Sequence, residues 1–161
     1  MPFSELPNVL VNVLKQRNVT DIELNKIKRI AKVSDFALDV IAKQPDLLSQ
    51  LEQPLLALQL PATQESEWPS IIRRWRSAQS CKLIWRDIAK IDSVQQTLLG
   101  STYIAEQALS VAFDAILKSM QAVHGVVRNE AGQQQYMVVL GLGKLGGGEL
   151  NFSSDVDLVY A

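Results

Sequence analysis

This sequence has one cysteine, no long apolar run and a net charge close to zero, and each of these features excludes a class of protein. The 161 residues include one cysteine, Cys81, so the chain cannot form an intramolecular disulfide or a metal cluster built on several cysteines. The sequence shows no N-terminal signal-peptide pattern and no run of about 20 apolar residues that could span a bilayer. We therefore expect a soluble, cytoplasmic protein that has no membrane partner.

The charge balance gives no general reason to expect a nucleic-acid partner either. The formal net charge is −1, too small to predict binding to nucleic acid or to an anionic surface. The charge is unevenly distributed, because residues 1–90 carry 13 Lys and Arg against 10 Asp and Glu, whereas residues 91–161 carry 3 against 7. An acidic C-terminal part suits a cation site, although so small a difference decides little by itself.

The first three quarters of the chain have the apolar periodicity of helices. With 47% hydrophobic and 20% charged residues, the chain can bury a sizeable core. Short helices with brief connections predict a small bundle. These predicted helices follow Ser4, begin at Thr20 or Asp21, follow Ser34 as far as Pro45, and cover 46–53.

Two longer helices are predicted after an interruption. Residues 59–69 lose the periodicity and contain two prolines, which predicts a connecting loop. A helix then extends from Ile71 to Ile88, and another runs from near Ser101 to His124, which Gly125 follows as a typical C-terminal cap.

Most of the other conspicuous side chains on these helices are expected to be structural. Cys81, Trp75 and Trp85 fall on an apolar stripe and should pack in the core, and Trp68 should mark the passage from loop to helix. The chain has one local basic cluster, for which a solvated helix face with ion pairs is the expected arrangement and a contact with an anionic partner is the alternative. Its members are Arg73, Arg74, Arg76 and Arg86, with Asp87 or Asp92 as partners for Arg86.

The pattern changes after Gly125. Residues 128–134 are polar and turn-like, 135–140 form a compact apolar run that predicts a buried strand, and a glycine-rich loop follows. Residues 155–160 alternate with period two and predict a second strand. We therefore divide the chain into a helical part, 1–125, and the beginning of a second domain, 126–161.

The glycine-rich loop contains a dinucleotide-binding fingerprint, G-x-G-x-x-G, over residues 141–146. That fingerprint should open a helix and lead to a second parallel strand. Here Gly146 is followed by two more glycines, which begin helices poorly, and Asp155 comes too soon for a helix and a returning parallel strand. Lys144 is followed by Leu145, which also excludes a Walker A loop. A Rossmann fold is therefore disfavoured.

A better interpretation takes the glycines together with Asp155 and Asp157. Residues two apart on a strand point to the same face, so the two carboxylates could converge on one or two divalent cations such as Mg²⁺. Glycines allow phosphate to approach the backbone closely, and Ser153 or Ser154 could add a hydroxyl. In an Asp-x-Asp pair without such a context, Asp155 would more often be a turn residue and Asp157 a solvated strand residue. Here the adjoining glycine loop and apolar strand favour phosphoryl transfer.

The stretch from Gly143 to Tyr160, which reads GKLGGGELNFSSDVDLVY, closely resembles the bacterial bifunctional glutamine synthetase adenylyltransferase/adenylyl-removing enzymes. That family belongs to the DNA polymerase beta-like nucleotidyltransferases. Residues 73–76 and 84–88 are similar to its helical lead-in, so the resemblance covers about 70–160 well. It implies a mainly α fold with a small β part, in which a helical bundle leads into the first strands of a nucleotidyltransferase α+β domain.

The resemblance also implies an activity, a cofactor and partners. The family has one half that removes AMP from adenylylated glutamine synthetase by phosphorolysis, which yields ADP, and one that adds AMP from ATP. The preceding helical segment and the sequence of residues 148–154 are more similar to the removing half. The transferring half is the alternative. As in relatives, Asp155 and Asp157 would be catalytic and hold Mg²⁺, Gly146, Gly147 and Ser154 would contact phosphate or AMP, and a PII-type regulator and glutamine would be further partners.

Such sites in the family use a third carboxylate from a later strand, which these residues do not include. We therefore expect the 161-residue chain to be inactive alone. A rival hypothesis makes it a non-catalytic helical docking module that keeps only part of a site. Lys144 remains open between a phosphate contact and a solvated lysine, and Asn151 is expected to shape the loop through hydrogen bonds.

Overall fold

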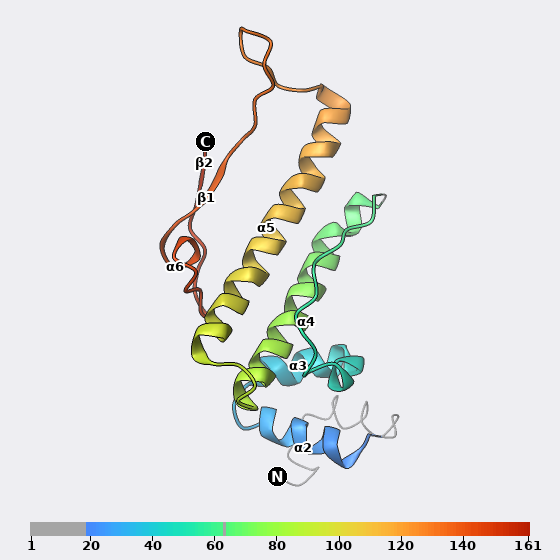
Figure 1. Cartoon of the computed structure of the whole chain (residues 1–161). Helices are drawn as coiled ribbons and strands as arrows, with labels where there is room; N and C mark the ends of the chain where they lie inside the picture. The colour runs from blue at the N-terminus through green and yellow to red at the C-terminus, as the bar shows by residue number, and fades with distance from the viewer. Residues whose placement is uncertain (1–18, 63) are drawn as a thin grey trace.

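Two long antiparallel helices lie side by side and carry the smaller elements around them (Figure 1). The computed structural model describes residues 19–62 and 64–161, so the helix predicted after Ser4 falls outside the described residues. The chain is mainly α with a small β part, as predicted. The elements are α2 Asp21–Ile30, α3 Asp35–Lys43, η2 Pro45–Ser49, η3 Glu65–Glu67, α4 Trp68–Ile88, α5 Val94–His124, β1 Val139–Gly141, α6 Gly143–Gly146 and β2 Leu158–Tyr160.

The starts of α2 and α3 follow directly from their capping residues. The Thr20 hydroxyl accepts the Glu23 N–H at 3.2 Å, while the Glu23 carboxylate accepts the Thr20 N–H at 2.9 Å, so the two residues form a capping box. Ser34 accepts the Ala37 N–H at 3.1 Å and begins α3. Both predicted starts are confirmed. The short helix predicted over 46–53 is the 3₁₀ helix η2.

The core lies where α2, α3 and η2 pack against the C-terminal half of α4. Cys81 is fully buried and Trp85 is 3% exposed, so both are core residues as predicted, while Trp75 is only half-buried. Burial raises the pKa of the Cys81 thiol to about 12. The other members of this core are Ile27, Ile30, Ala37, Leu38, Val40, Ile41, Leu47, Leu48, Leu51 and Ala78.

The prediction of a loop over residues 59–69 is wrong at the C-terminal end of that range. Helix α4 begins at Trp68, whose indole N–H donates to the Pro61 carbonyl at 2.9 Å, so Trp68 does mark the loop-to-helix junction. Pro69 is tolerated there because the first turn of a helix leaves its N–H groups without helical acceptors.

Helix α5 begins at Val94 rather than near Ser101, which corrects the sequence prediction. Ser93 and Gln96 form a capping box that starts the helix. Gly100 then lies inside α5, against α4, and a Cβ there would come within 2.7 Å of Leu83 Cδ1. Gly100 therefore permits a close approach of α5 to α4. The helix ends at His124, as predicted.

The C-terminal part forms a short antiparallel ribbon. Val139 pairs with Tyr160 and Gly141 with Leu158, and Val138 and Ala161 extend the pairing through two backbone hydrogen bonds of 2.7 and 3.0 Å. The strands predicted over 135–140 and 155–160 are therefore shorter than expected. The antiparallel pairing also rules out the parallel crossover of a dinucleotide-binding unit in this segment.

The predicted burial of the first strand is wrong for the described chain. Met137, Val138 and Leu140 are 47%, 51% and 48% exposed, and Val156, within the second predicted strand, is 38% exposed. The physical reason is that the sheet has two strands and packs near one helix, α5, so part of its apolar surface has no covering element among residues 19–62 and 64–161.

Candidate functional site

The glycine segment after β1 forms a single helical turn, not the start of a long helix. Gly143 has φ +56° and Gly148 φ +72°, a backbone region that favours glycine, so these residues open and close the turn. Gly146 is required for a different reason, since a Cβ there would collide with the Gly141 carbonyl oxygen. Gly147 has ordinary space and φ −82°.

Gly146 and Gly147, the predicted phosphate-contacting glycines, are exposed, but their N–H groups already donate within the turn. Gly146 donates to the Leu142 carbonyl at 3.4 Å, and Gly147 donates to the Gly143 carbonyl at 3.0 Å. The two glycines can therefore admit a ligand close to the backbone, while the donors for an anion must come from other groups.

A hydrogen bond at the base of the loop brings the aspartates next to the glycine turn. The Leu142 N–H donates to the Asp157 carbonyl at 2.9 Å, which closes residues 143–156 into one loop. Asp155 and Asp157 are both exposed. Within the described residues neither carboxylate takes part in a hydrogen bond or ion pair, so both are available to a ligand.

Three side chains of the loop form a connected polar network. Lys144 Nζ lies 3.3 Å from Ser154 Oγ, and the Ser154 hydroxyl donates to Asn151 Oδ1 at 2.7 Å. Asn151 Oδ1 also accepts the Ser153 N–H at 3.2 Å. Asn151 therefore shapes the loop through hydrogen bonds, as predicted. The network places the ammonium of Lys144 beside Ser154. This ammonium is the only positively charged side chain of the loop.

Helix α5 supports the loop from behind. The Thr102 hydroxyl accepts the Leu150 N–H at 3.2 Å and donates to the Leu98 carbonyl at 3.0 Å. Thr102, Leu145 and Leu150 are each 5% exposed. The loop is thus fixed to α5 by one polar contact and two buried leucines. Sequence reasoning missed Thr102; the signal was a hydroxyl residue on the apolar side of a long helix.

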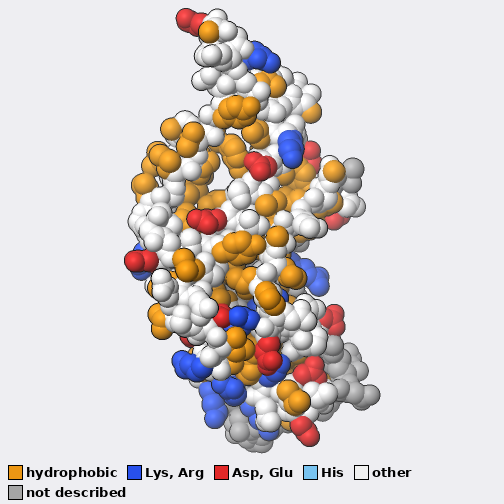
Figure 2. All heavy atoms as spheres, in the orientation of Figure 1, with side chains coloured by type: hydrophobic (Ala, Val, Ile, Leu, Met, Phe, Trp, Pro, Cys, Tyr) orange, Lys and Arg blue, Asp and Glu red, His pale blue; other side chains and the backbone are white. Residues whose placement is uncertain are grey.

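A largely apolar groove of about 810 Å³ lies between α5 and the ribbon, where Figure 2 shows hydrophobic side chains around a hollow in the surface. It runs behind the glycine turn, which contributes Leu145 and Gly146. The side chains that line it from α5 include Leu109, Phe113, Leu117 and Met120, and those from the ribbon include Val139 and Leu158.

The donor chemistry of the loop fits Mg²⁺, with ligands still to be supplied. Asp155 and Asp157 offer the hard oxygen atoms that Mg²⁺ prefers. No group of three or more His, Cys, Asp or Glu side chains within residues 19–62 and 64–161 is arranged to hold a metal ion. A cation at the two aspartates would therefore draw its remaining ligands from water, substrate phosphates or further protein groups.

The basic residues on α4 behave in two ways. Arg86 pairs with Asp92, with contacts of 2.8 and 2.6 Å, and donates to the Glu52 carbonyl at 2.7 Å, so its structural interpretation is confirmed. Arg73, Arg74 and Arg76 are exposed.

Sequence reasoning missed Lys82, which is fully buried and donates to the Pro54 carbonyl at 2.6 Å. Burial lowers the pKa of Lys82, as does the nearby Arg86.

The structure contains no helix, within its described residues, with the length and apolar character needed to cross a bilayer.

Comparison with known proteins places the chain in a family. Residues 24–161 match the profile of the glutamate-ammonia ligase adenylyltransferase family. A "bifunctional glutamine synthetase adenylyltransferase/adenylyl-removing enzyme" of Stenotrophomonas maltophilia R551-3 is 54% identical over 139 residues, which are 84% of this chain and 15% of the relative. The protein of that name from strain K279a is 49% identical over 156 residues, which are 94% of this chain and 17% of the relative.

A more distant relative carries the same name. The Shewanella oneidensis protein is 33% identical over 156 residues, which are 89% of this chain and 16% of the relative. The chain thus spans about one sixth of the length of these curated relatives. Because the profile match extends from Leu24, within α2, through the complete glycine–aspartate loop, this chain belongs to the glutamate-ammonia ligase adenylyltransferase family.

Proposed function

We propose that this chain supplies the helical lead-in and the first part of the site that removes AMP from adenylylated glutamine synthetase. The observation that carries the proposal is the closed loop, in which the Leu142–Asp157 hydrogen bond brings both aspartates to the glycine turn and the Lys144–Ser154 contact. One short segment thus contains exposed carboxylates that could bind a cation and a lysine that could bind phosphate oxygens. The wording of residues 148–154, which resembles the removing half of the family, favours removal over transfer.

In the proposed reaction, an oxygen of inorganic phosphate attacks the phosphorus of the protein-bound AMP. The bond from that phosphorus to the side-chain oxygen of glutamine synthetase breaks, so ADP forms, and the side-chain oxygen takes up the proton that the attacking phosphate gives up. Asp155 and Asp157 would hold Mg²⁺, which supplies charge neutralisation on the phosphate oxygens when bound. Lys144 would hold the phosphate, and Gly146 and Gly147 would let it approach the backbone. Ser154 would keep Lys144 in place, while its own proton is directed to Asn151.

The chain alone is proposed to be inactive. Among the described residues, Asp155 and Asp157 have no third acidic group, Glu149 of the loop included, arranged with them to hold a metal ion. Family resemblance further suggests a cytoplasmic protein that responds to a PII-type regulator and to glutamine. A docking module without chemistry would need neither free aspartate, so the state of Asp155 and Asp157 separates the two hypotheses.

A chimera tests which activity the segment serves. The aligned 139 residues of the S. maltophilia R551-3 enzyme would be replaced by the corresponding residues of this chain, since the two are 54% identical. Phosphate-dependent release of ADP from adenylylated glutamine synthetase and ATP-dependent adenylylation would be assayed separately. Asp155→Asn and Asp157→Asn should each lower the first activity by roughly a hundredfold or more, because they remove charge from the metal site.

The matched control is Asp114→Asn, which removes a carboxylate from the α5 side of the groove and leaves the loop unchanged. It should retain removal within about twofold, since a surface charge away from reacting atoms contributes little. Adenylylation should survive all three substitutions. The proposal is wrong if the aspartate variants lose adenylylation and keep removal, or if both activities survive.

A further inference from the structure

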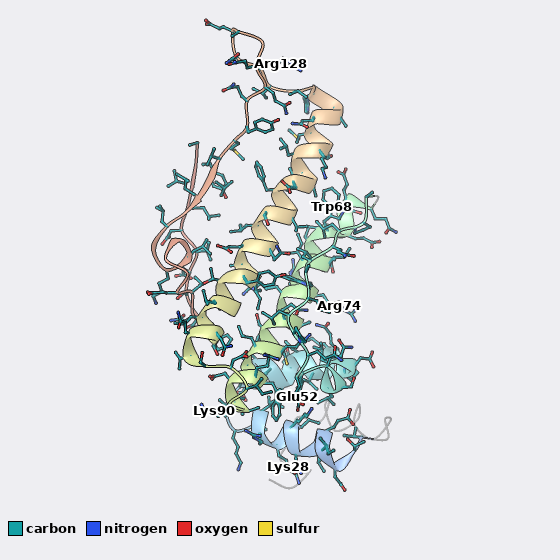
Figure 3. The ribbon with its side chains drawn as sticks, in the orientation of Figure 1. Lys28, Glu52, Trp68, Arg74, Lys90 and Arg128 are labelled. Carbon is teal, nitrogen blue, oxygen red and sulfur yellow. The ribbon has the colours of Figure 1, made fainter. Side chains whose placement is uncertain are left out.

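A basic surface covers the end of the bundle where α2 and α4 finish. It is formed by Lys28, Lys32 and Lys90, hereafter the basic end. The Arg29 guanidinium donates to the Ile88 carbonyl at 2.7 Å and stacks 5.0 Å from the Trp85 ring, so the two helix ends are held together. Figure 3 shows Lys28 and Lys90 at this end, and Figure 2 shows blue side chains gathered there.

Unlike Lys26 and Arg86, the three lysines have no acidic partner among the described residues. Lys26 pairs with Glu52 at 2.8 Å, and Arg86 pairs with Asp92 at 2.6 Å. Among residues 19–62 and 64–161, Lys28, Lys32 and Lys90 form no ion pair. The carboxylates nearest the basic end in the sequence are Asp35 at the start of α3 and Asp87 in the last turn of α4, whereas Asp21 and Glu23 lie in the first turn of α2, at its other end. The basic end therefore presents a net positive surface.

Lys90 occupies a backbone position that costs stability. Its φ is +61°, in the left-handed region where glycine is the usual residue after a helix. A non-glycine residue there is strained by about 1–2 kcal/mol. A favourable charge interaction with the end of α4 offsets part of this cost, but a lysine anywhere in the last turn could provide it without strain. A side chain at this position therefore calls for a role outside the helix.

Exposed aliphatic side chains lie beside these lysines in the sequence. Val33 is 66% exposed, Ile91 is 44% exposed and Val94 is 73% exposed. Val33 follows Lys32, and Ile91 follows Lys90. Aliphatic groups among lysines fit the surface of a protein better than a chain of phosphates, because they contribute only when apolar area is buried.

Helix α5 connects the basic end with the proposed site. Helix α5 begins at Val94, and its Thr102 holds the loop through the Leu150 N–H at 3.2 Å. Eight residues of helix correspond to about 12 Å along the axis. Val94, beside the basic end in the sequence, therefore lies about 12 Å along α5 from the residue that holds the loop. A protein that brings a modified side chain to the loop must also rest on neighbouring surface, and the start of α5 offers one.

We propose that the basic end is a docking surface for an acidic, partly apolar patch of the protein substrate, next to its modified residue. This inference rests on the proposed function for its choice of partner. Lys28, Lys32 and Lys90 recognise carboxylates, and Val33, Ile91 and Val94 bury apolar area against the same patch.

The test measures binding of the whole 161-residue chain to immobilised, unmodified glutamine synthetase by biolayer interferometry. The variant Lys28→Glu/Lys32→Glu/Lys90→Glu should weaken binding by roughly tenfold or more, and added salt should weaken the wild type. The matched control, Arg73→Glu/Arg74→Glu/Arg76→Glu, reverses three exposed cations elsewhere on α4 and should stay within about threefold. Circular dichroism establishes that each variant is folded.

A single substitution separates docking from local structure. Lys90→Gly relieves the left-handed strain and removes the ammonium, so it should weaken binding by roughly twofold to fivefold without lowering stability. The proposal is overturned if the wild-type chain does not bind, if both triple variants weaken binding equally, or if a DNA duplex competes with glutamine synthetase for the basic end.

The two proposals fail in different ways. If the chain docks as described but the chimera removes no AMP, the proposed function is wrong while the surface stands. If the chimera removes AMP and the lysine variant neither weakens binding nor raises the substrate concentration needed for half-maximal removal, the docking surface is wrong.

Discussion

The helical bundle buries its apolar side chains, whereas the C-terminal ribbon leaves many of its apolar side chains exposed. In the bundle, Ile27, Ile30 and Ile41 are fully buried, whereas in the ribbon Leu140 is 48% exposed and Tyr160 60% exposed. The bundle is therefore held by burial, which is large and non-directional. The loop between the strands depends on glycine conformations and a few hydrogen bonds, so its geometry is specified by fewer and weaker contacts. A site built this way should be easier to disturb than the bundle beneath it.

The largest expected contrast concerns Cys81. Its burial in the bundle should slow alkylation by roughly a thousandfold relative to the unfolded chain, since the bundle must open first. Because burial raises the folded-state pKa to about 12 from 9.0, the unfolded thiol loses its proton first. Stability should therefore fall as pH rises from about 9 towards 12. Rapid alkylation of the native chain at pH 8 would contradict this description of the core.

Truncating one buried side chain should affect the bundle more than the ribbon. Ile27→Ala removes a fully buried side chain and should lower the free energy of unfolding by about 2–5 kcal/mol. Val159→Ala, on a residue that is 43% exposed, should lower it by less than about 1 kcal/mol. Urea unfolding followed by circular dichroism measures both. Equal losses would mean that the ribbon is packed as tightly as the bundle.

Two threonines on α5 test how the loop is attached. Thr102→Val leaves the Leu150 N–H without its acceptor and should lower the opening free energy of that amide by about 1–3 kcal/mol in hydrogen exchange. Thr97→Val is the control, because the buried Thr97 hydroxyl has no hydrogen-bond partner among the described residues. That change should be neutral or slightly stabilising. Unchanged protection of Leu150 in Thr102→Val would show that the tether is unimportant.

Two adjacent glycines test the turn itself. Gly146→Ala forces the Gly141 carbonyl to move and should destabilise the loop by about 1–3 kcal/mol. Gly147→Ala meets only ordinary contacts, the nearest at 3.5 Å, and should be tolerated. Amide chemical shifts over residues 141–157 report the difference. Similar shift changes in the two variants would argue against the geometry of the turn.

The smallest effect is expected at the end of α4. Lys90→Gly should raise the free energy of unfolding by about 0.5 kcal/mol, because relief of the left-handed strain slightly exceeds the lost helix-end charge and the added freedom of the unfolded chain. Lys32→Gly, one residue beyond the C-cap of α2, provides the comparison and should not stabilise. Thermal unfolding distinguishes the two, and a destabilised Lys90→Gly would show that the lysine has a local structural role.

Capping residues and the long glycine–aspartate motif made much of this chain predictable. Thr20 and Ser34 begin their helices because short polar side chains satisfy free N–H groups there, a signal that is local in sequence. The start of α5 was predicted near Ser101 instead of after the Ser93 cap, and only the contact with Leu83 explains why Gly100 lies inside the helix. Contacts between distant segments leave little trace in a single sequence.

The candidate site was predicted as a set of residues but not as an arrangement. The motif identified Asp155 and Asp157, yet the strand begins only at Leu158, and period-two alternation therefore did not describe the aspartates. The donation of the Gly146 and Gly147 N–H groups within the turn also depends on the fold of the loop. Thr102, far away in sequence, could not be linked to Leu150 from periodicity alone.

The most direct test of the central claim is a Mn²⁺ titration of the 161-residue chain followed by amide NMR, with Mn²⁺ standing in for Mg²⁺. If the two aspartates and the glycine turn form one cation and phosphate site, paramagnetic broadening should begin at residues 153–158 and extend to 142–147. Asp155→Asn/Asp157→Asn should abolish it, and ADP should strengthen it in the wild type. Broadening centred elsewhere, or unchanged in the double variant, would contradict the account.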